Sequence, residues 1–179
     1  GLGDLGWDGA QPGHRVDVEN EQRVRRERDD RGQQGPARAG DEAQIDCATL
    51  HGQQTLAWLL RDIRAGNLTG IPHPGLVKLL CWQQAWLAAY GFHVRFDILS
   101  GLRSGATNRS TEGAARNSLH QPDAANLFRA VDFRSATVNS EYLGRLAALA
   151  QQGGVGFYDG AGFVHVDVGR SRYWRRRAR

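Results

Sequence analysis

The sequence predicts an α+β fold, in which helices pack on one side of a small antiparallel sheet. Segments with helical spacing come first, and short stretches of alternating polarity follow them. Apolar residues recur three and four positions apart over 55–63, and Gly66 then offers a helix stop. Residues 74–90 predict a second helix that opens at Pro74 and is apolar around much of its circumference. We expect this second helix, with its aromatic residues, to belong to the core.

The strands are predicted in the second half of the chain. Apolar and polar residues alternate over 92–99, and a long polar loop follows at 100–117. A short strand is expected at 130–134, and then a helix over 140–152 that Ser140 would cap. Residues 153–168 contain two strand patterns around a glycine-containing turn, which predicts a hairpin.

The composition divides the chain into three parts. Residues 1–43 are rich in Gly, Gln, Arg and Asp and carry few large apolar side chains, so we expect a disordered or loosely packed leader. A single surface helix is the alternative for this segment. Residues 44–174 carry the predicted elements of one domain, and residues 175–179 form a basic tail.

The formal net charge is +4, and the basic excess is concentrated at the C-terminal end. Arginines in this tail could attract anionic envelope polymers. Nucleic acid is not expected as a partner, because aromatic residues are not interleaved with the arginines. An integral membrane segment is not expected either, since no apolar run approaches the ~20 residues that a bilayer requires. No secretory signal is visible in the sequence, which leaves the compartment open.

Two cysteines, Cys47 and Cys81, are neither adjacent nor in a CxxC pattern. They could form one disulfide in an oxidising compartment or remain as buried thiols. We favour buried thiols, and the spacing excludes a zinc-binding cysteine pair.

Three residues suggest a metal site. His120 lies in the long loop region, Asp132 is the polar member of an apolar strand, and His165 lies in the middle of another strand. Two histidines and one carboxylate form a common catalytic zinc set that leaves a position for water. The choice is weak by itself, because 6 histidines and 19 acidic residues allow many such triples.

The order of several motifs strengthens this choice. They are Ser100-Gly-Leu-Arg-Ser104, Asn117-Ser-Leu-His120, Ala130-Val-Asp-Phe133, Gly153-Gly-Val-Gly-Phe-Tyr158, Phe163-Val-His-Val-Asp167 and Gly169-Arg-Ser-Arg-Tyr-Trp174. Over residues 44–174 this series resembles the D-Ala-D-Ala metallopeptidase group, and in particular its MepK-like branch of periplasmic murein endopeptidases. The resemblance implies a hedgehog/D-Ala-D-Ala-peptidase-like fold.

The resemblance also implies residue roles. His120, Asp132 and His165 match the zinc ligands of the family, and Ser118 belongs to the same motif as the first of them and is expected to bind substrate. Arg103 matches the arginine that binds the substrate peptide or stabilises the oxyanion, tasks that suit a guanidinium group. The alternative for Arg103 is a salt bridge that organises its loop.

The chain departs from the family pattern beside the first ligand. Eleven residues separate His120 from Asp132, more than the family usually has, so residues 122–128 resemble an insertion. Asp123 lies within it and is an alternative ligand. The insertion is expected to narrow or reshape the substrate site.

The general base is the second departure. Gly162 occupies the position where many relatives carry an acid. Asp167 is the best candidate, because residues two apart on a strand share a face and His165 is two positions before it. Asp167 could instead orient a ligand imidazole as a hydrogen-bond acceptor. Asp159, in the preceding turn, is the remaining candidate.

These features predict a periplasmic or exported zinc enzyme that hydrolyses cross-links or stem peptides of bacterial peptidoglycan. A D,D- or L,D-carboxypeptidase acting on the same polymer is one alternative. A catalytically inactive peptidoglycan-binding module is the other.

Overall fold

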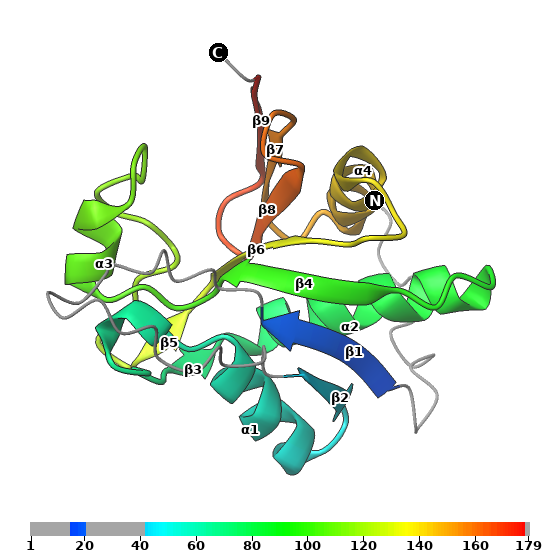
Figure 1. Cartoon of the computed structure of the whole chain (residues 1–179), viewed down its shortest axis with the longest axis horizontal. Coiled ribbons are helices and arrows are strands. Elements are labelled where there is room, and N and C mark those ends of the chain that lie inside the picture. Colours follow the sequence, from blue (N-terminus) through cyan, green and yellow to red (C-terminus); the bar gives the residue numbers. More distant parts are fainter. Residues whose placement is uncertain (1–14, 21–41, 178–179) are drawn as a thin grey trace, which may run out of the picture.

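The computed structural model describes residues 15–20 and 42–177 (Figure 1). Its centre is a seven-stranded sheet with the order β2-β1-β4-β6-β8-β7-β9. The strands are β1 (Arg15–Asn20), β2 (Glu42–Asp46), β4 (Arg95–Ser100), β6 (Ala130–Arg134), β7 (Gly154–Tyr158), β8 (Phe163–Asp167) and β9 (Arg172–Arg176). The α+β class is therefore confirmed.

The sheet is mixed, so the prediction of a purely antiparallel sheet is wrong. β1 runs parallel to β4, and β9 runs parallel to β7, whereas the other pairs are antiparallel. The second parallel pair follows from chain direction. β7 and β8 form the predicted hairpin, and the chain then reverses after β8 and returns on the far side of β7, so β9 runs in the same direction as β7.

Both ends of the chain take part in this sheet. Residues 15–20, which we assigned to a leader, form β1 between β2 and β4. Residues 1–14 and 21–41, the rest of that predicted leader apart from the start of β2, lie outside the described residues. At the other end Arg175 and Arg176 belong to β9, and Arg175 forms ion pairs with Glu141 and Asp159. Part of the tail's charge is therefore paired within the domain.

The described residues contain four α-helices and one short 3-10 turn. They are α1 (Leu50–Leu59), the 3-10 turn Ile63–Ala65, α2 (Pro74–Ala89), α3 (Gly105–Ser110) and α4 (Ser140–Ala150). α2 begins as predicted at Pro74, and α4 is capped by Asn139, one residue before the predicted cap. α3 interrupts the stretch predicted as loop, because the Ser104 side chain accepts a hydrogen bond from the Thr107 amide and caps it. No helix among these is both long and apolar enough to cross a bilayer.

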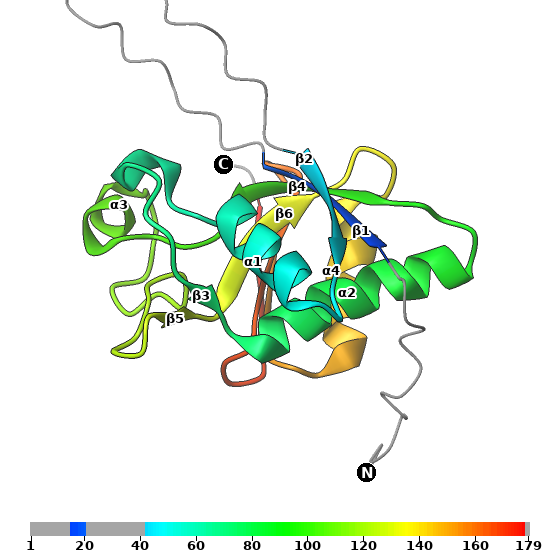
Figure 2. The same cartoon turned by 90° about the horizontal axis from the view of Figure 1, so that it is seen from below.

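α1, α2 and α4 lie against the sheet (Figure 2), and their buried side chains form one continuous core with those of the strands. In β6 the side chains of Val131 and Phe133 are buried in this core, and in β8 those of Val164 and Val166 are. Because side chains alternate along a strand, Asp132 and His165 point to the opposite face of the sheet. The core thus fixes the face on which the predicted metal ligands lie.

The second helix is less buried than its sequence predicts. Its leucines are in the core, but the side chain of Trp86 is 37% exposed and that of Tyr90 is 65% exposed. Trp82, Trp86 and Tyr90 follow one another at a spacing of four, with adjacent ring centroids 5.5 Å apart. Four-residue spacing places the three rings along one side of the helix. The exposure of this side increases towards the C-terminal end of α2.

The predicted insertion forms a second, two-stranded sheet. Leu127–Phe128 (β5) pairs in parallel with Ile71–Pro72 (β3), just before α2. The amide of His73 donates to the carbonyl of Phe128 at 2.8 Å. The insertion is therefore tied to the start of α2.

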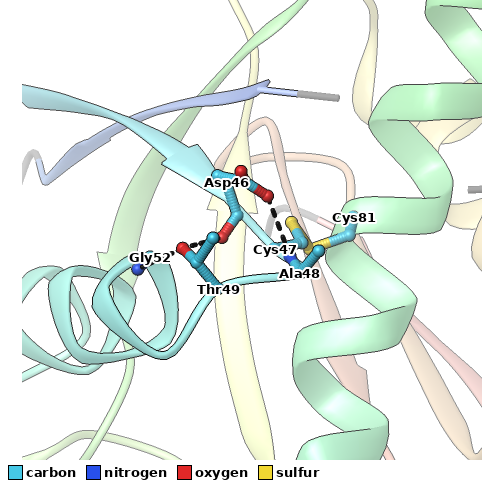
Figure 3. The surroundings of a disulfide bond; sticks show 6 residues. All are labelled: Asp46, Cys47, Ala48, Thr49, Gly52 and Cys81. Atoms are coloured by element: carbon cyan, nitrogen blue, oxygen red, sulfur yellow. Dashed lines mark hydrogen bonds between the residues drawn. A yellow bond between two sulfur atoms is a disulfide. The ribbon is translucent and has the colours of Figure 1, made fainter. Parts of the chain in front are cut away.

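Cys47 and Cys81 form a disulfide, so the prediction of buried thiols is wrong (Figure 3). Cys47 follows β2, where the turn is held by hydrogen bonds from Ala48 and Thr49 to Asp46. This turn brings the Cα atoms of the two cysteines to 6.3 Å, a separation that a disulfide can span. The bond fastens the start of α1 to the middle of α2.

Loss of this disulfide should lower stability measurably. The bond closes a loop with a sequence separation of 34 residues. For a loop of that size the chain-entropy contribution to the free energy of unfolding is about 3–4 kcal/mol. The double variant Cys47→Ser/Cys81→Ser should therefore unfold at lower urea concentration than the wild type. Dithiothreitol should shift the wild type to the same midpoint and leave the variant unchanged; equal midpoints for all samples would contradict the prediction.

Candidate metal centre

The three predicted ligands converge on one point. His120 comes from the loop after α3, whereas Asp132 and His165 are directly paired residues of β6 and β8. The Nε2 atom of His120 lies 3.2 Å from Nδ1 of His165 and 3.3 Å from Oδ1 of Asp132. Nδ1 of His165 lies 2.8 Å from the same Asp132 oxygen. These three atoms form a compact triangle of potential ligands.

The triangle has the size that a divalent metal requires. Zinc binds imidazole nitrogen and carboxylate oxygen at about 2.0–2.2 Å in tetrahedral geometry, which places neighbouring ligand atoms about 3.3 Å apart. The observed separations of 2.8–3.3 Å are close to this value. Two nitrogens and one oxygen are also the donor types that catalytic zinc sites use. The residues therefore fit a zinc ion.

Hydrogen bonds orient both imidazole rings. Nδ1–H of His120 donates to the carbonyl of Gly101 at 2.6 Å, which turns Nε2 towards the cluster. Nε2–H of His165 donates to Oδ2 of Asp167 at 3.0 Å, which turns Nδ1 towards Asp132 and His120. Such outer hydrogen bonds orient metal-binding imidazoles and raise their basicity.

Asp167 is surrounded by donors. Its side chain has no solvent exposure, and besides His165 it accepts from the amides of Gly154 and Gly169 and from the guanidinium of Arg172. Burial alone would raise the pKa of this carboxyl, but the hydrogen bonds from His165 and Arg172 hold it well below its usual range. Asp167 is therefore an ionised, fixed acceptor at the far nitrogen of His165.

Arg103 lies on the other side of the ligand cluster. Its guanidinium pairs with Oδ2 of Asp132, and its Nε–H donates to Ser100 at 2.7 Å. The amide of Arg103 also donates to the carbonyl of His120 at 2.9 Å. Arg103 therefore lies beside the cluster, and the salt bridge that we considered as its alternative role is made to Asp132. Its role in substrate binding stays a prediction.

The electrostatics of the cluster favour an ionised carboxylate at Asp132 and a neutral imidazole at His120, and they stabilise the protonated form of His165. Burial lowers the pKa of His120, although Asp132 acts in the opposite direction. Burial alone would raise the pKa of Asp132, but the adjacent imidazoles of His120 and His165 hold it well below its usual value. Burial would also lower the pKa of His165, and hydrogen bonds to Asp132 and Asp167 raise it instead. An ionised carboxylate can bind a cation without first losing a proton.

The remaining predicted residues lie around this cluster. Ser118 accepts from the His120 amide at 3.3 Å and so supports the turn that carries this ligand. Asp123, the alternative ligand, is outside the cluster; it caps a turn at Ala125 and Leu127 and pairs with Arg129 at 2.7 Å. Asp159 pairs with Arg175 at the other end of β7.

Gly101, Arg172 and Trp174 also lie at the site, although the sequence predicted no role for them. All three lie within the ordered motifs, and the spacing of two between Arg172 and Trp174 would have placed them on one face of a strand. Trp174 packs its ring against that of His165, with ring centroids 5.1 Å apart. Gly101 is fixed by close packing, since a Cβ atom there would overlap the backbone of Leu60.

A surface cavity lies elsewhere on the domain. Its volume is about 380 Å³, and none of the predicted site residues lines it. The lining residues are Ala43, Gln44, His93, Arg95, Ser135, Ala136 and Thr137. The proposed ligands are almost fully buried, with 2% exposure for His120, 6% for Asp132 and 7% for His165.

Comparison with known proteins agrees with this geometry. A family profile described as peptidoglycan L,D-endopeptidase MepK matches residues 47–174. The chain belongs to the MepK family. This confirms the resemblance predicted from the motifs, and the match contains all three proposed ligands. No solved structure matches the chain significantly, so the hedgehog-like fold stays a prediction.

Two curated members of the MepK family illustrate the similarity. The chain is 33% identical over 129 residues to the peptidoglycan L,D-endopeptidase MepK of Escherichia coli K12, covering 68% of this chain and 66% of that protein. It is 34% identical over 124 residues to the probable peptidoglycan L,D-endopeptidase MepK of Haemophilus influenzae, covering 67% of this chain and 62% of that protein. The chain thus covers slightly less than two thirds of the length of each.

Metal titration tests the ligand assignment. The wild type should bind one equivalent of zinc, and His165→Ala should abolish tight binding because it removes a ligand. Asp167→Asn should weaken zinc binding by about 10–100-fold, since it disturbs the acceptor that orients His165. His93→Ala, at the separate cavity, is the matched control and should bind zinc like the wild type. Wild-type zinc affinity in His165→Ala would exclude this centre.

Proposed function

We propose that the chain is a zinc-dependent peptidase that hydrolyses peptide cross-links or stem peptides of bacterial peptidoglycan. The observation that carries this proposal is the convergence of His120, Asp132 and His165, in a member of a family named for peptidoglycan L,D-endopeptidase activity. An L,D-endopeptidase is the specific activity that we infer. The carboxypeptidase and the inactive binding module remain the alternatives to be tested.

We assign one role to each residue of the proposed site. His120, Asp132 and His165 would hold the metal. When bound, the metal would polarise the scissile carbonyl as a Lewis acid and lower the pKa of a water molecule. Asp167 orients His165, because its carboxylate is fully buried and contacts the far nitrogen of that ring. A general base must reach the reacting water, and the enclosure of Asp167 by four donor groups favours the orienting role over the base.

Arg103 is proposed to bind the substrate carbonyl. A guanidinium has five N–H donors, and the contacts with Asp132 and Ser100 use two of them. Its pairing with Asp132 fixes the group beside the metal, so further donors can meet charge that develops on the carbonyl oxygen. Ser118 is proposed to line the same site through the loop that carries His120.

The compartment is proposed to be periplasmic or otherwise exported. Peptidoglycan lies outside the cytoplasmic membrane, and the Cys47–Cys81 disulfide is typical of proteins that fold in an oxidising compartment. Peptidoglycan peptides are the proposed partners. Binding of anionic envelope polymers by the C-terminal arginines stays a prediction.

Digestion of defined muropeptides tests the reaction. The zinc-loaded protein should separate the two stems of a cross-linked muropeptide, and a chelator should stop the reaction until zinc is added back. Mass spectrometry distinguishes the outcomes, because a carboxypeptidase would remove only a terminal residue from an uncross-linked stem. His165→Ala is the inactive control. Absence of any product from all cross-link types, with zinc bound, would favour the binding module.

Substitution of Arg103 tests the carbonyl-binding role. Arg103→Lys retains the positive charge beside Asp132 but loses the planar fork, so kcat should fall by about 10²–10³-fold, the usual effect of removing one oxyanion donor. Zinc affinity should change much less than kcat. Arg145→Lys, at an exposed ion pair with Glu141 on α4, should keep wild-type kcat. Unchanged kcat in Arg103→Lys would contradict the role.

A further inference from the structure

Beside the proposed metal centre, glycines of β7 lie between large side chains of β8 and β9. Gly156 of β7 pairs with His165 of β8 on one side and with Trp174 of β9 on the other. One pair further along, Gly154 is bonded through its amide to Asp167 and pairs with Arg172. On this face of the sheet β7 therefore contributes two glycines beside the ligand strand.

These glycines let side chains from β8 and β9 meet above β7. A Cβ atom at Gly156 would overlap the indole of Trp174. A Cβ atom at Gly154 would lie 2.6 Å from both Oδ2 of Asp167 and Nη1 of Arg172. The indole of Trp174 thus crosses the bare backbone of β7 and reaches the ring of His165, with centroids 5.1 Å apart and planes inclined by 50°.

Several contacts hold the indole in this position. The guanidinium of Arg172 lies 5.0 Å from the ring of Trp174, and the same guanidinium is paired with Asp167. The indole N–H donates to the Tyr158 hydroxyl at 3.4 Å, and the Tyr158 ring stacks on Phe163 at 4.4 Å. The three aromatic side chains are only partly buried. The result is a fixed aromatic surface, formed by Tyr158, Phe163 and Trp174, that begins at a metal ligand.

We infer that Trp174 is a substrate-binding residue whose indole packs against the aliphatic part of the peptide residue next to the scissile bond. This inference rests on the proposed peptidase function. Sites for small ligands combine a few polar groups with aromatic walls, and here the polar groups are the metal ligands and Arg103. A half-buried indole gives a large apolar contact at low cost in conformational entropy, because neighbouring groups already fix its two side-chain torsions.

A purely structural role for Trp174 makes a different prediction. If the indole served only to support His165, its removal would weaken zinc binding and lower kcat. If it contacts substrate, its removal raises KM and the dissociation constant of the peptide while zinc affinity stays near the wild-type value. Peptide binding, zinc binding and turnover must therefore be measured separately.

The experiment uses Trp174→Ala and Trp174→Phe in the full chain. A purified cross-linked muropeptide is the probe, titrated by calorimetry into protein treated with chelator, so that binding is measured without cleavage. Trp174→Ala should bind the peptide at least about 10-fold more weakly, which is a loss of about 1.4 kcal/mol in binding free energy. Trp174→Phe should recover most of the affinity. Trp86→Ala, which removes a partly exposed tryptophan from α2, should bind like the wild type.

A second variant, Gly156→Ala, adds a methyl group where the indole of Trp174 lies. Gly156→Ala should displace the indole and weaken peptide binding about as much as Trp174→Ala does. In the Trp174→Ala background the same change should cost little more, because the atoms with which it collides are gone; this non-additivity is the signature of a shared contact.

The outcomes separate this inference from the proposed function. Suppose that the zinc-loaded protein cleaves no muropeptide, and that peptide binding still depends on Trp174. The proposed hydrolysis is then contradicted, and the binding role of Trp174 stands. If cleavage occurs and Trp174→Ala changes neither KM nor the dissociation constant, the inference is overturned and the function stands. Loss of zinc affinity in Trp174→Ala, with peptide affinity unchanged, also overturns it. A wild type that neither binds nor cleaves the muropeptide overturns both.

Discussion

The register between β6 and β8 is the constraint on which the site depends. Asp132 and His165 are opposite each other across these two strands, and the valines and Phe133 that alternate with them are buried in the core. A slip of one residue in either strand would turn its polar side chain into the core and its apolar neighbours out. The free energy of core packing therefore also enforces the separation of the ligand atoms. His120 is the only proposed ligand that is positioned by a loop, and its ring and backbone are bonded to Gly101 and Arg103.

A layer of fixed charges surrounds the ligands. Arg103 neutralises one oxygen of Asp132, and Asp167 accepts the proton-bearing nitrogen of His165. Arg172 in turn balances the charge of Asp167, and this pairing brings β9 against the site. Asp132 and Asp167 thus each have an opposite charge and hydrogen-bond donors beside them, as burial requires. The arrangement also couples the last strand of the domain to the orientation of a ligand.

Much of the site could be predicted from sequence, because its residues lie in short motifs with strict local spacing. The positions of His120, Asp132, His165 and Arg103 depended on those motifs, and the structure brings the four together. The short strand at 130–134 and the hairpin within 153–168 were also predicted correctly, and His165 and Asp167 share a face as their spacing of two predicts. Asp123 could be kept as an alternative only because of its distance along the chain from His120, and the structure places it in a turn with Arg129 instead.

The features that were missed depend on contacts between distant segments. Pairing of Cys47 with Cys81 requires the turn after β2 to lie against the middle of α2, which no local pattern reveals. The parallel strand pairs depend on where the chain re-enters the sheet, whereas periodicity reports only which residues form strands. The aromatic residues of α2 looked like core because helical spacing gives the width of an apolar face but not the extent of the layer that covers it. Gly156 could not be interpreted until its neighbour across the strand, Trp174, was known.

The small sheet formed by β3 and β5 has a consequence for how this domain can vary. The segment 122–128 is anchored by backbone bonds at both margins, since Ile71 donates to Asn126 and Arg129 donates to Leu119. Its tip at Ala124 and Ala125 is exposed, whereas the ligand-bearing backbone on either side is held by these bonds. Exchanges at the tip can therefore accumulate without moving His120 or Asp132.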